Sequence, residues 1–308
     1  MVKRKFGSTN LDVTPLGFGA APIGFLKTEQ DRVATILNLL LDEGINLIDT
    51  AAMYEGSESL IGQAVGHRRS EYVLVSKCGT RVPEISAPLW SAELISQTVD
   101  RALRNLRTDH LDVMLLHSCD LKTLQKGEAL AALVKARDAG KVRFVGYSGD
   151  NQTAAYAASF PDVAVIETSI SIADQANLQA VLPAAAEHQV GIIAKRPIAN
   201  AAWMGVEGRS GFYGGYVKPY VDRLEQMNVA PTDIGFDSDG SDAWAEMALR
   251  FTLSHPGVHT AIIGTTNPDN ARKNIAFANK GPLSPEQVAQ IRQAFREADP
   301  SEKWIGMQ

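Results

Sequence analysis

The sequence predicts a closed barrel of eight parallel strands, each followed by a helix, behind a short N-terminal hairpin. Short apolar runs alternate with longer helical patterns along nearly all of the 308 residues, which is typical of βαβ units. A doubly wound sheet would need a Gly-x-Gly-x-x-Gly turn that opens a helix, and residues 17–22 match that turn only weakly. We therefore expect one (β/α)8 barrel domain over residues 1–308.

The expected elements follow one another in a regular order. Gly7-Ser8-Thr9-Asn10 has the composition of a hairpin turn near the N-terminus. Eight apolar runs are predicted to form the barrel strands: residues 16–19, 46–49, 73–77, 112–117, 142–148, 163–169, 191–195 and 261–264. Helical periodicity between them is clearest over residues 31–43, 92–106 and 124–139.

A long segment after the seventh strand interrupts this alternation. Residues 199–242 contain the aromatic residues Phe212, Tyr213 and Tyr216 in a Gly-rich stretch. We expect a long loop here, and loops of this length in compact domains are usually functional or mobile. Its aromatic side chains would either cover a ligand at the barrel mouth or pack the loop onto the barrel.

Composition and charge exclude several classes of function. The formal net charge is −5, with 30 Lys and Arg against 35 Asp and Glu, so we expect no nucleic-acid surface. No apolar run approaches the length that spans a bilayer, and no apolar segment follows the basic N-terminus as in a signal peptide. Cys78 and Cys119 form neither a disulfide framework nor a metal-ligand pattern, so we expect inert thiols and a cytoplasmic protein. The sequence leaves the oligomeric state open.

Four ionisable side chains lie at or just after the ends of three successive predicted strands. Asp49 ends the second strand and Tyr54 follows it, while Lys77 and His117 end the third and fourth strands. In a parallel barrel, catalytic side chains collect at the C-terminal ends of the strands. A buried lysine needs a carboxylate to remain charged, so we expect Lys77 to pair with Asp49.

Proton transfer is the chemistry that these residues indicate. Tyrosine has a reference pKa of about 10, and a nearby ammonium lowers it, so we expect Lys77 to lower the pKa of Tyr54. We expect His117 to donate a hydrogen bond to a substrate carbonyl oxygen. Taken singly, His117 fits a core histidine, Lys77 a strand end with its head in solvent, and Asp49 a partner of backbone amides. Their occurrence together favours a catalytic site.

Three segments of the chain resemble the aldo-keto reductases. Residues 47–58, which contain Asp49 and Tyr54, are similar to that family's Asp-to-Tyr signature. Residues 102–112, which lead to His117, are similar to the segment before the family's active-site histidine, and residues 139–146 to the segment opening its fifth strand. The resemblance implies a (β/α)8 barrel, a nicotinamide cofactor usually carrying a 2′-phosphate, and reduction of a small aldehyde or ketone, or the reverse oxidation. It also implies Tyr54 as general acid, supported by Asp49, Lys77 and His117.

The resemblance assigns further residues to the cofactor, with departures from the family pattern. We expect Gly19, Ala20 and Asp49 beside the cofactor and Ser148 at its carboxamide. Glu167 stands where relatives commonly carry Gln, and a carboxylate accepts from the carboxamide NH2 but cannot donate.

Lys195, Arg196 and Pro197 occupy the end of the seventh strand, where many relatives place an aromatic or small polar residue. Lys195 or Arg196 is expected either to bind the pyrophosphate or to form a structural ion pair.

The helix after the eighth strand is the last cofactor element. Asn267 as N-cap and Pro268 at the first helical position predict a helix start, whose free amides suit a phosphate. The candidate cofactor residues here are Gly264, Thr265, Thr266, Asn270, Lys273 and Asn274.

The choice between NADP and NAD depends on charge at this helix. Some relatives carry a Lys and an Arg for the 2′-phosphate at the positions of Gly264 and Asn270. Arg272 and Lys273 are expected to compensate, so the expected cofactor is NADP, with NAD possible.

Two other functions remain open at this point. A cofactor-binding regulatory or channel-associated subunit would have the same fold, although the four intact residues weigh against a purely structural role. A metal-dependent barrel hydrolase would need clustered ligands, and His117 has no partner histidine, so we expect no metal.

Overall fold

The computed structural model describes residues 1–207 and 212–307, and within them eight parallel strands close into a barrel. Their order around the barrel is β10-β3-β4-β5-β6-β7-β8-β9. The strands are β3 Leu16–Gly19, β4 Leu47–Asp49, β5 Val73–Cys78, β6 Leu111–His117, β7 Val142–Ser148, β8 Val163–Ser169, β9 Gly191–Lys195 and β10 Thr260–Ile263. The predicted barrel is confirmed, with strand ends shifted by at most one residue, because strands buried on both faces appear as near-continuous apolar runs.

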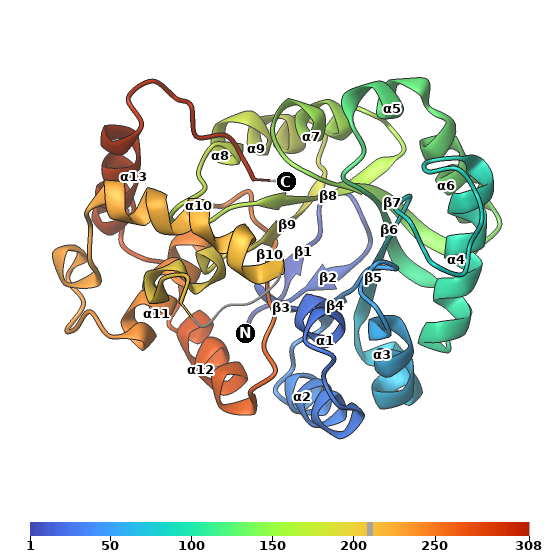
Figure 1. Cartoon of the computed structure of the whole chain (residues 1–308), viewed down its shortest axis with the longest axis horizontal. Helices are drawn as coiled ribbons and strands as arrows, with labels where there is room; N and C mark the ends of the chain where they lie inside the picture. The colour runs from blue at the N-terminus through green and yellow to red at the C-terminus, as the bar shows by residue number, and fades with distance from the viewer. Residues whose placement is uncertain (208–211, 308) are drawn as a thin grey trace.

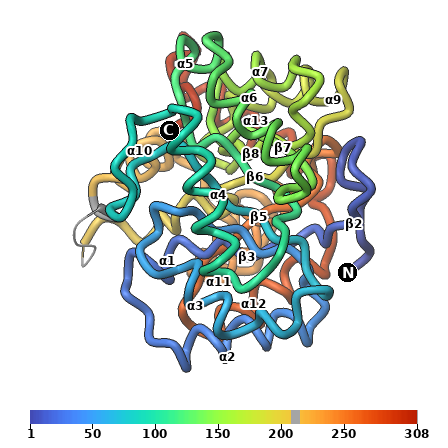
Figure 2. Tube along the Cα trace, turned by 90° about the vertical axis from the view of Figure 1, so that its right-hand side faces the viewer, coloured from blue at the N-terminus to red at the C-terminus, as the bar shows by residue number. Residues whose placement is uncertain are grey.

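The N-terminal hairpin closes one end of the barrel. β1 Arg4–Lys5 pairs antiparallel with β2 Asp12–Val13. Phe6 belongs to an apolar cluster with inward-facing strand residues such as Leu115 and Ile193. Gly7 has φ 58°, and a Cβ there would lie 2.3 Å from the Gly191 amide nitrogen, so the turn requires glycine. Figure 2 shows β2 on one side of the molecule and α10 Phe212–Met227 on the other.

The helices surround the barrel on its outside (Figure 1). They are α1 Ala21–Phe25, α2 Gln30–Asp42, α3 Ser57–Val65, α4 Ala92–Leu106, α5 Leu121–Lys126, α6 Glu128–Asp138, α7 Asn151–Ala158, α8 Asn177–Ala180, α9 Leu182–Glu187, α10, α11 Ser241–Leu253, α12 Pro268–Asn279 and α13 Pro285–Ala298. The helix predicted over residues 124–139 is in fact two helices. Gly127, with φ 74°, ends α5 and precedes α6, which the apolar periodicity alone did not reveal.

The long loop predicted after the seventh strand is mostly helical. The 3-10 segment η2 Ala199–Met204 is followed by α10 and by η3 Pro231–Ile234. Val217 and Tyr220 are buried, which gives α10 an apolar contact face that the Gly-rich composition of its start concealed. The side chains of Phe212 and Tyr213 lie outside the described part of the chain.

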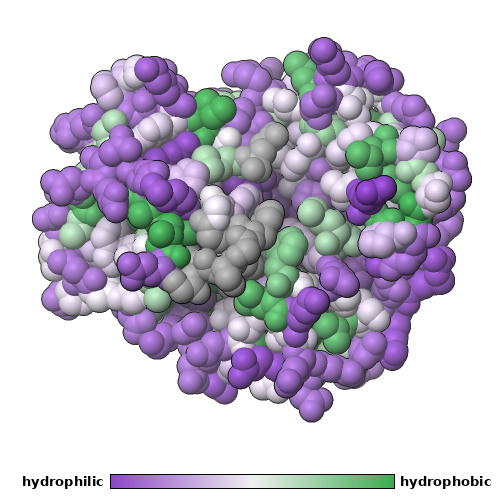
Figure 3. Space-filling view, viewed as in Figure 1, coloured by the Kyte–Doolittle hydropathy of each residue, from purple (hydrophilic) through white to green (hydrophobic). Residues whose placement is uncertain are grey.

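The surface in Figure 3 is hydrophilic around its rim, and hydrophobic residues gather nearer the middle of that face. Among the described residues, no helix combines the length and apolar character needed to cross a membrane.

Candidate active site

The structure brings Asp49 and Lys77 into direct contact. Asp49 ends β4 and Lys77 lies near the end of β5, and these strands pair in parallel. The Lys77 ammonium lies 2.6 Å from each Asp49 carboxylate oxygen and 3.0 Å from the Thr50 carbonyl oxygen. The lysine and aspartate side chains are 0% and 2% exposed, so water screens the pair very little. The ion pair expected between them is confirmed.

Tyr54 lies beside this pair, in the loop between β4 and α3. The Lys77 Nζ is 5.4 Å from the centre of the Tyr54 ring. That ring packs edge-on against His117, with 6.1 Å between ring centres, and against Phe25 at 5.2 Å. A local turn holds the loop, because the Tyr54 amide donates to the Ala51 carbonyl at 3.0 Å. Tyr54, Lys77 and His117 therefore meet at the C-terminal end of the barrel.

Burial dominates the ionisation of Tyr54. Burial, together with the negative charges of Asp49 and Glu167, raises the pKa of Tyr54 to about 12, although the positive charges of Lys77 and Arg196 oppose this. We expected the lysine to lower the pKa below its usual value, and the net direction is the opposite. The lysine does act in the expected direction, but loss of hydration has the larger effect.

Lys77 itself remains an ammonium. Burial alone would lower its pKa, but the charges of Asp49 and Glu167 outweigh burial and raise the pKa above its usual value.

His117 is held in its neutral form. Burial lowers the pKa of His117 well below its usual value, and the positive charges of Lys77, Lys195 and Arg196 act in the same direction. Its Nδ1 is buried and accepts or donates no hydrogen bond within the described residues. A neutral imidazole carries one N–H, so it offers one donor toward a bound oxygen atom.

Glu167 on β8 is a second carboxylate at Lys77. Its Oε2 lies 3.2 Å from the Lys77 Nζ, and its Oε1 accepts from the Ser148 hydroxyl at 3.4 Å. Oε2 has no well-aligned hydrogen-bond donor in the part of the chain that the structure describes. Burial and the charge of Glu167 raise the pKa of Asp49 well above its usual value, although Lys77 opposes this. Sequence reasoning found Glu167 as a cofactor residue but missed its contact with Lys77.

Lys195 and Arg196 are both engaged within the protein. Lys195 pairs with the buried Asp150 at 3.1 Å. Arg196 donates to the Ser169 hydroxyl at 3.0 Å and to the Tyr220 hydroxyl at 3.3 Å. Of the two alternatives, Lys195 forms the structural ion pair, whereas the hydrogen bonds of Arg196 go to neutral oxygens. Pro197 follows them at the end of β9 and accepts a hydrogen bond from Thr252 through its carbonyl oxygen.

The C-terminal segment lies on this polar cluster, which sequence reasoning missed entirely. The Met307 carbonyl accepts from Arg196, and the Met307 amide donates to Asp174 at 3.2 Å. The amide of Gly306 donates to the Asn151 side chain at 2.7 Å. Figure 1 shows the C-terminus near the middle of the molecule, close to β8. No local sequence signal marks this segment, because it contributes backbone atoms and its partners are side chains far away along the chain.

The start of α12 is built as the sequence predicted. The Asn267 side chain accepts from the Asp269 amide at 2.9 Å, and Pro268 is the first helical residue. A Cβ at Gly264 would lie 2.6 Å from the Gly19 carbonyl oxygen and 2.6 Å from Cδ of Pro22. This crowding favours glycine at position 264.

The two cations expected to compensate are exposed and held by carboxylates. Arg272 lies 3.2 Å from Asp269, and Lys273 lies 2.8 Å from Asp242. Thr265 accepts from the Asn267 amide through its hydroxyl. The Ala20 amide donates to the Asp49 carbonyl oxygen. Asn270 and Asn274 in α12 complete the expected group of cofactor residues.

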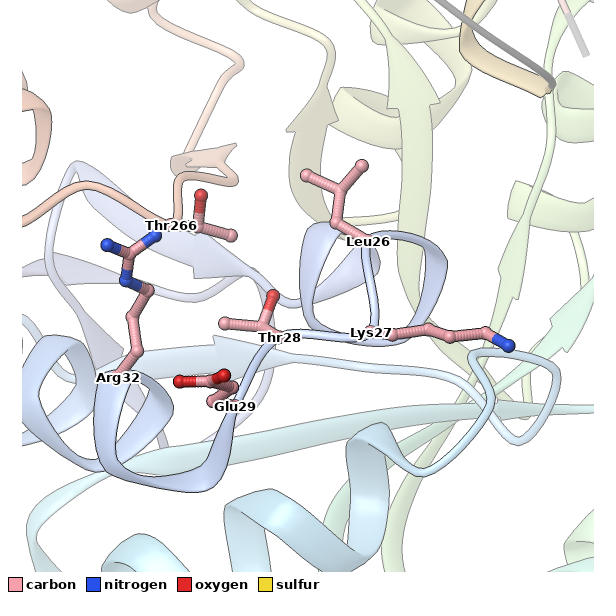
Figure 4. Close-up of a pocket in the computed structure, with 6 residues that line it drawn as sticks. All are labelled: Leu26, Lys27, Thr28, Glu29, Arg32 and Thr266. Carbon is pink, nitrogen blue, oxygen red and sulfur yellow. The ribbon is translucent and has the colours of Figure 1, made fainter.

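A cavity of about 420 Å³ lies next to this helix start. Its lining comprises Leu26, Lys27, Thr28, Glu29, Arg32 and Thr266. Figure 4 shows the Arg32 side chain extending from α2 toward Thr266, whereas Lys27 points away from them. The cavity thus has a cation near the α12 start that the sequence did not indicate.

Comparison with known proteins identifies the family. The model of the Aldo/keto reductase family matches residues 15–296. The chain belongs to this family. It is similar to the uncharacterized oxidoreductase YqkF of Bacillus subtilis, with 26% identity over 95% of this chain and 96% of the relative. It is also similar to the L-galactose dehydrogenase of Arabidopsis thaliana, with 26% identity over 89% of this chain and 86% of the relative.

Its fold is shared with the holo form of the aldo-keto reductase AKR11C1 from Bacillus halodurans. The TM-score is 0.77, with 25% identity and 96% of each chain covered. This aldo-keto reductase is therefore an oxidoreductase of a family that uses nicotinamide cofactors.

The residues of the site fit such a cofactor. The buried Glu167 Oε2 has an acceptor position that no described donor fills, and a carboxamide NH2 is a donor. Further polar groups lie at the same end of the barrel. They are the Gly19 carbonyl oxygen, which lies close to Gly264, and the capped start of α12. Within the described ranges, no group of His, Cys, Asp and Glu is arranged to hold a metal ion.

Proposed function

We propose that this aldo-keto reductase interconverts an aldehyde or ketone and the corresponding alcohol with NADP or NAD, using Tyr54 as general acid and base. The observation that carries the proposal is the buried ion pair of Lys77 with Asp49 beside Tyr54. A buried ion pair carries a desolvation cost, and its position against a tyrosine at the C-terminal end of a parallel barrel, where active sites lie, supports a catalytic role.

The roles of the side chains follow from their charges. A Tyr54 with its pKa raised is fully protonated at neutral pH and has a proton to donate to the substrate oxygen. The positive charge of Lys77 stabilises the phenolate that remains, and Asp49 keeps that lysine oriented. The neutral His117 donates its N–H to the same substrate oxygen. When bound, the cofactor supplies or accepts the hydride.

Cofactor binding is assigned to the strand ends around these residues. Ser148 and Glu167 would hold the carboxamide, and Gly19, Ala20 and Asp49 would lie beside it. Thr265, Thr266, Asn270 and Asn274 at the α12 start would contact the phosphates. The cofactor would then be bordered by Lys195, Arg196 and Pro197. Their contacts within the protein would hold the walls of its site in place.

A modest preference for NADP is part of the proposal. Arg272 and Lys273 are the cations on α12, but each already has a carboxylate partner. Arg32 adds a third cation that extends toward Thr266. Exposed cations of this kind support a small discrimination between NADP and NAD.

A regulatory or channel-associated subunit that binds the cofactor with little turnover is the alternative. The intact contact of Lys77 with Asp49 beside Tyr54 favours turnover.

Replacement of Tyr54 tests the function directly. Tyr54→Phe removes the donated proton and little else, so we expect nearly all carbonyl reduction to be lost while cofactor affinity is retained. Turnover is measured with a panel of aldehydes, ketones and sugars with both cofactors, and affinity by quenching of protein fluorescence. Near wild-type turnover in this variant would overturn the role of Tyr54, and absence of turnover in the unmodified protein across the panel would favour the regulatory alternative.

A further inference from the structure

Lys77 is shared between two carboxylates. A lysine ammonium has three N–H donors. Those of Lys77 go to the two Asp49 carboxylate oxygens and the Thr50 carbonyl, while Glu167 Oε2 lies 3.2 Å away as an ion-pair partner. Glu167 is 2% exposed, and Asp49 is as deeply buried. Two buried carboxylates therefore compete for one cation.

Glu167 adds a second carboxylate beside the ion pair of Lys77 and Asp49. Lys195 is the next cation, but its close carboxylate partner is Asp150 at 3.1 Å.

The other groups that act on Tyr54 differ in sign. His117 is neutral, because its pKa lies well below the usual value. Arg196 donates to the Ser169 and Tyr220 hydroxyls and to the Met307 carbonyl, and its positive charge lowers the pKa of Tyr54, whereas Asp49 and Glu167 raise it. Replacing Glu167 by Gln would therefore remove one of the two carboxylates that oppose ionisation of Tyr54.

We propose that Glu167 is a positioning residue that keeps Tyr54 protonated and makes the site favour the oxidised, cationic nicotinamide cofactor over the reduced, neutral form. The inference rests on the proposed function. It concerns position 167, where this chain carries a charged Glu side chain and a Gln side chain would be neutral. Its physical basis is the buried carboxylate of Glu167 beside Lys77, because a buried negative charge opposes a second negative charge on Tyr54 and attracts a positive one. The direction of the effect on Tyr54 agrees with the contribution of Glu167 to its raised pKa.

Cofactor binding gives the first test. Dissociation constants of NADP⁺, NADPH, NAD⁺ and NADH are measured by calorimetry or fluorescence for the unmodified protein, Glu167→Gln, Glu167→Asp and Asp109→Asn. We expect Glu167→Gln to lower the ratio of oxidised to reduced affinity by on the order of tenfold, the effect of about one pKa unit of charge interaction. Glu167→Asp keeps the charge and should keep most of the ratio. Asp109→Asn removes a negative charge from an exposed carboxylate outside the site, so it should leave the ratio nearly unchanged.

The pH dependence of carbonyl reduction gives the second test. Reduction needs a protonated Tyr54, so its rate falls where the tyrosine ionises. We expect Glu167→Gln to move this alkaline limb toward lower pH by about one unit, because a negative charge is removed. A purely structural role for Glu167 would lower the rate without moving the limb.

The outcomes separate this inference from the proposed function. If Tyr54→Phe is inactive and both cofactor forms bind, but Glu167→Gln changes neither the affinity ratio nor the limb, only the role of Glu167 is overturned. If neither cofactor binds the unmodified protein, both proposals fail. Should Glu167→Gln not fold, as judged by circular dichroism, Glu167→Ala removes the same charge and decides. An affinity ratio in that variant equal to that of the unmodified protein contradicts the charge effect.

Discussion

At the level of single residues, Lys77 is the centre of the site. It is surrounded by Asp49, Thr50 and Glu167 and carries the charge that opposes the rise in the pKa of Tyr54. We expect Lys77→Met to reduce turnover severely and to shift the alkaline limb of the residual pH-rate profile upward, because the phenolate loses its cation. This shift is opposite to that expected for Glu167→Gln.

A matched control for Lys77 is Lys77→Arg, which retains the positive charge and should leave the limb closer to its original position. Removing the cation also leaves two carboxylates buried, so Lys77→Met should lower the free energy of unfolding by about 3 to 5 kcal/mol in urea denaturation. An unchanged pH-rate profile in Lys77→Met would show that Lys77 does not tune Tyr54.

At the level of elements, the turn from β10 into α12 depends on glycine. A Cβ at Gly264 would approach the Gly19 carbonyl oxygen and Pro22, both at 2.6 Å. We expect Gly264→Ala to lower the free energy of unfolding by roughly 1 to 3 kcal/mol, because backbone and ring must move apart. Gly257→Ala is the control, since a Cβ there would lie 3.5 Å from Leu182, an ordinary contact. Equal stabilities of the two variants in urea denaturation would contradict this expectation.

The cations near α12 give a prediction about cofactor choice. Arg272→Ala, Lys273→Ala and Arg32→Ala should each spare NADH affinity, and any that meets the 2′-phosphate should weaken NADPH by roughly 1.5 to 3 kcal/mol. We expect the largest effect at Arg32, because Arg272 and Lys273 already have carboxylate partners. Equal binding of NADPH and NADH by the unmodified protein, with no differential loss in any variant, would refute the NADP preference.

At the level of the whole molecule, Asp174 links the C-terminal segment to the barrel. Its Oδ2 accepts from the Tyr220 hydroxyl at 2.9 Å and from the Met307 amide at 3.2 Å. Burial, followed by the charge of Asp150, raises the pKa of Asp174 to about 7, although Arg223 opposes this. The folded protein therefore binds this proton more tightly than the unfolded chain does.

The consequence is a pH-dependent stability. The contribution of Asp174 is fully present below the unfolded pKa, about 4, and is lost as the pH rises through about 7. We expect Asp174→Asn, which carries no charge, to lose less unfolding free energy between pH 5 and pH 8 than the unmodified protein does. Urea denaturation at both pH values measures this, with the exposed Asp269→Asn as control. The same pH dependence in Asp174→Asn and the unmodified protein would contradict the role of Asp174.

Sequence patterns predicted the barrel because burial on both faces of a parallel strand leaves an apolar run that is visible locally. The same patterns placed Asp49, Lys77 and His117 at strand ends, and parallel strands bring such ends to one rim of the barrel. Local composition was misleading in two elements. The apolar period continued through Gly127, and the Gly-rich start of α10 concealed a helix.

The sequence by itself therefore determined the barrel, its strand ends and the pairing of Lys77 with Asp49, because these follow from short-range periodicity and parallel registry. Only the tertiary structure decided the electrostatics. Burial outweighs Lys77 at Tyr54, and Glu167 reaches Lys77 from β8, across the barrel. The tertiary structure alone also decided that the Met307 amide donates to Asp174, 133 positions away along the chain. Such contacts arise when distant segments close around one space, and hydration lost there depends on the whole fold rather than on any local pattern.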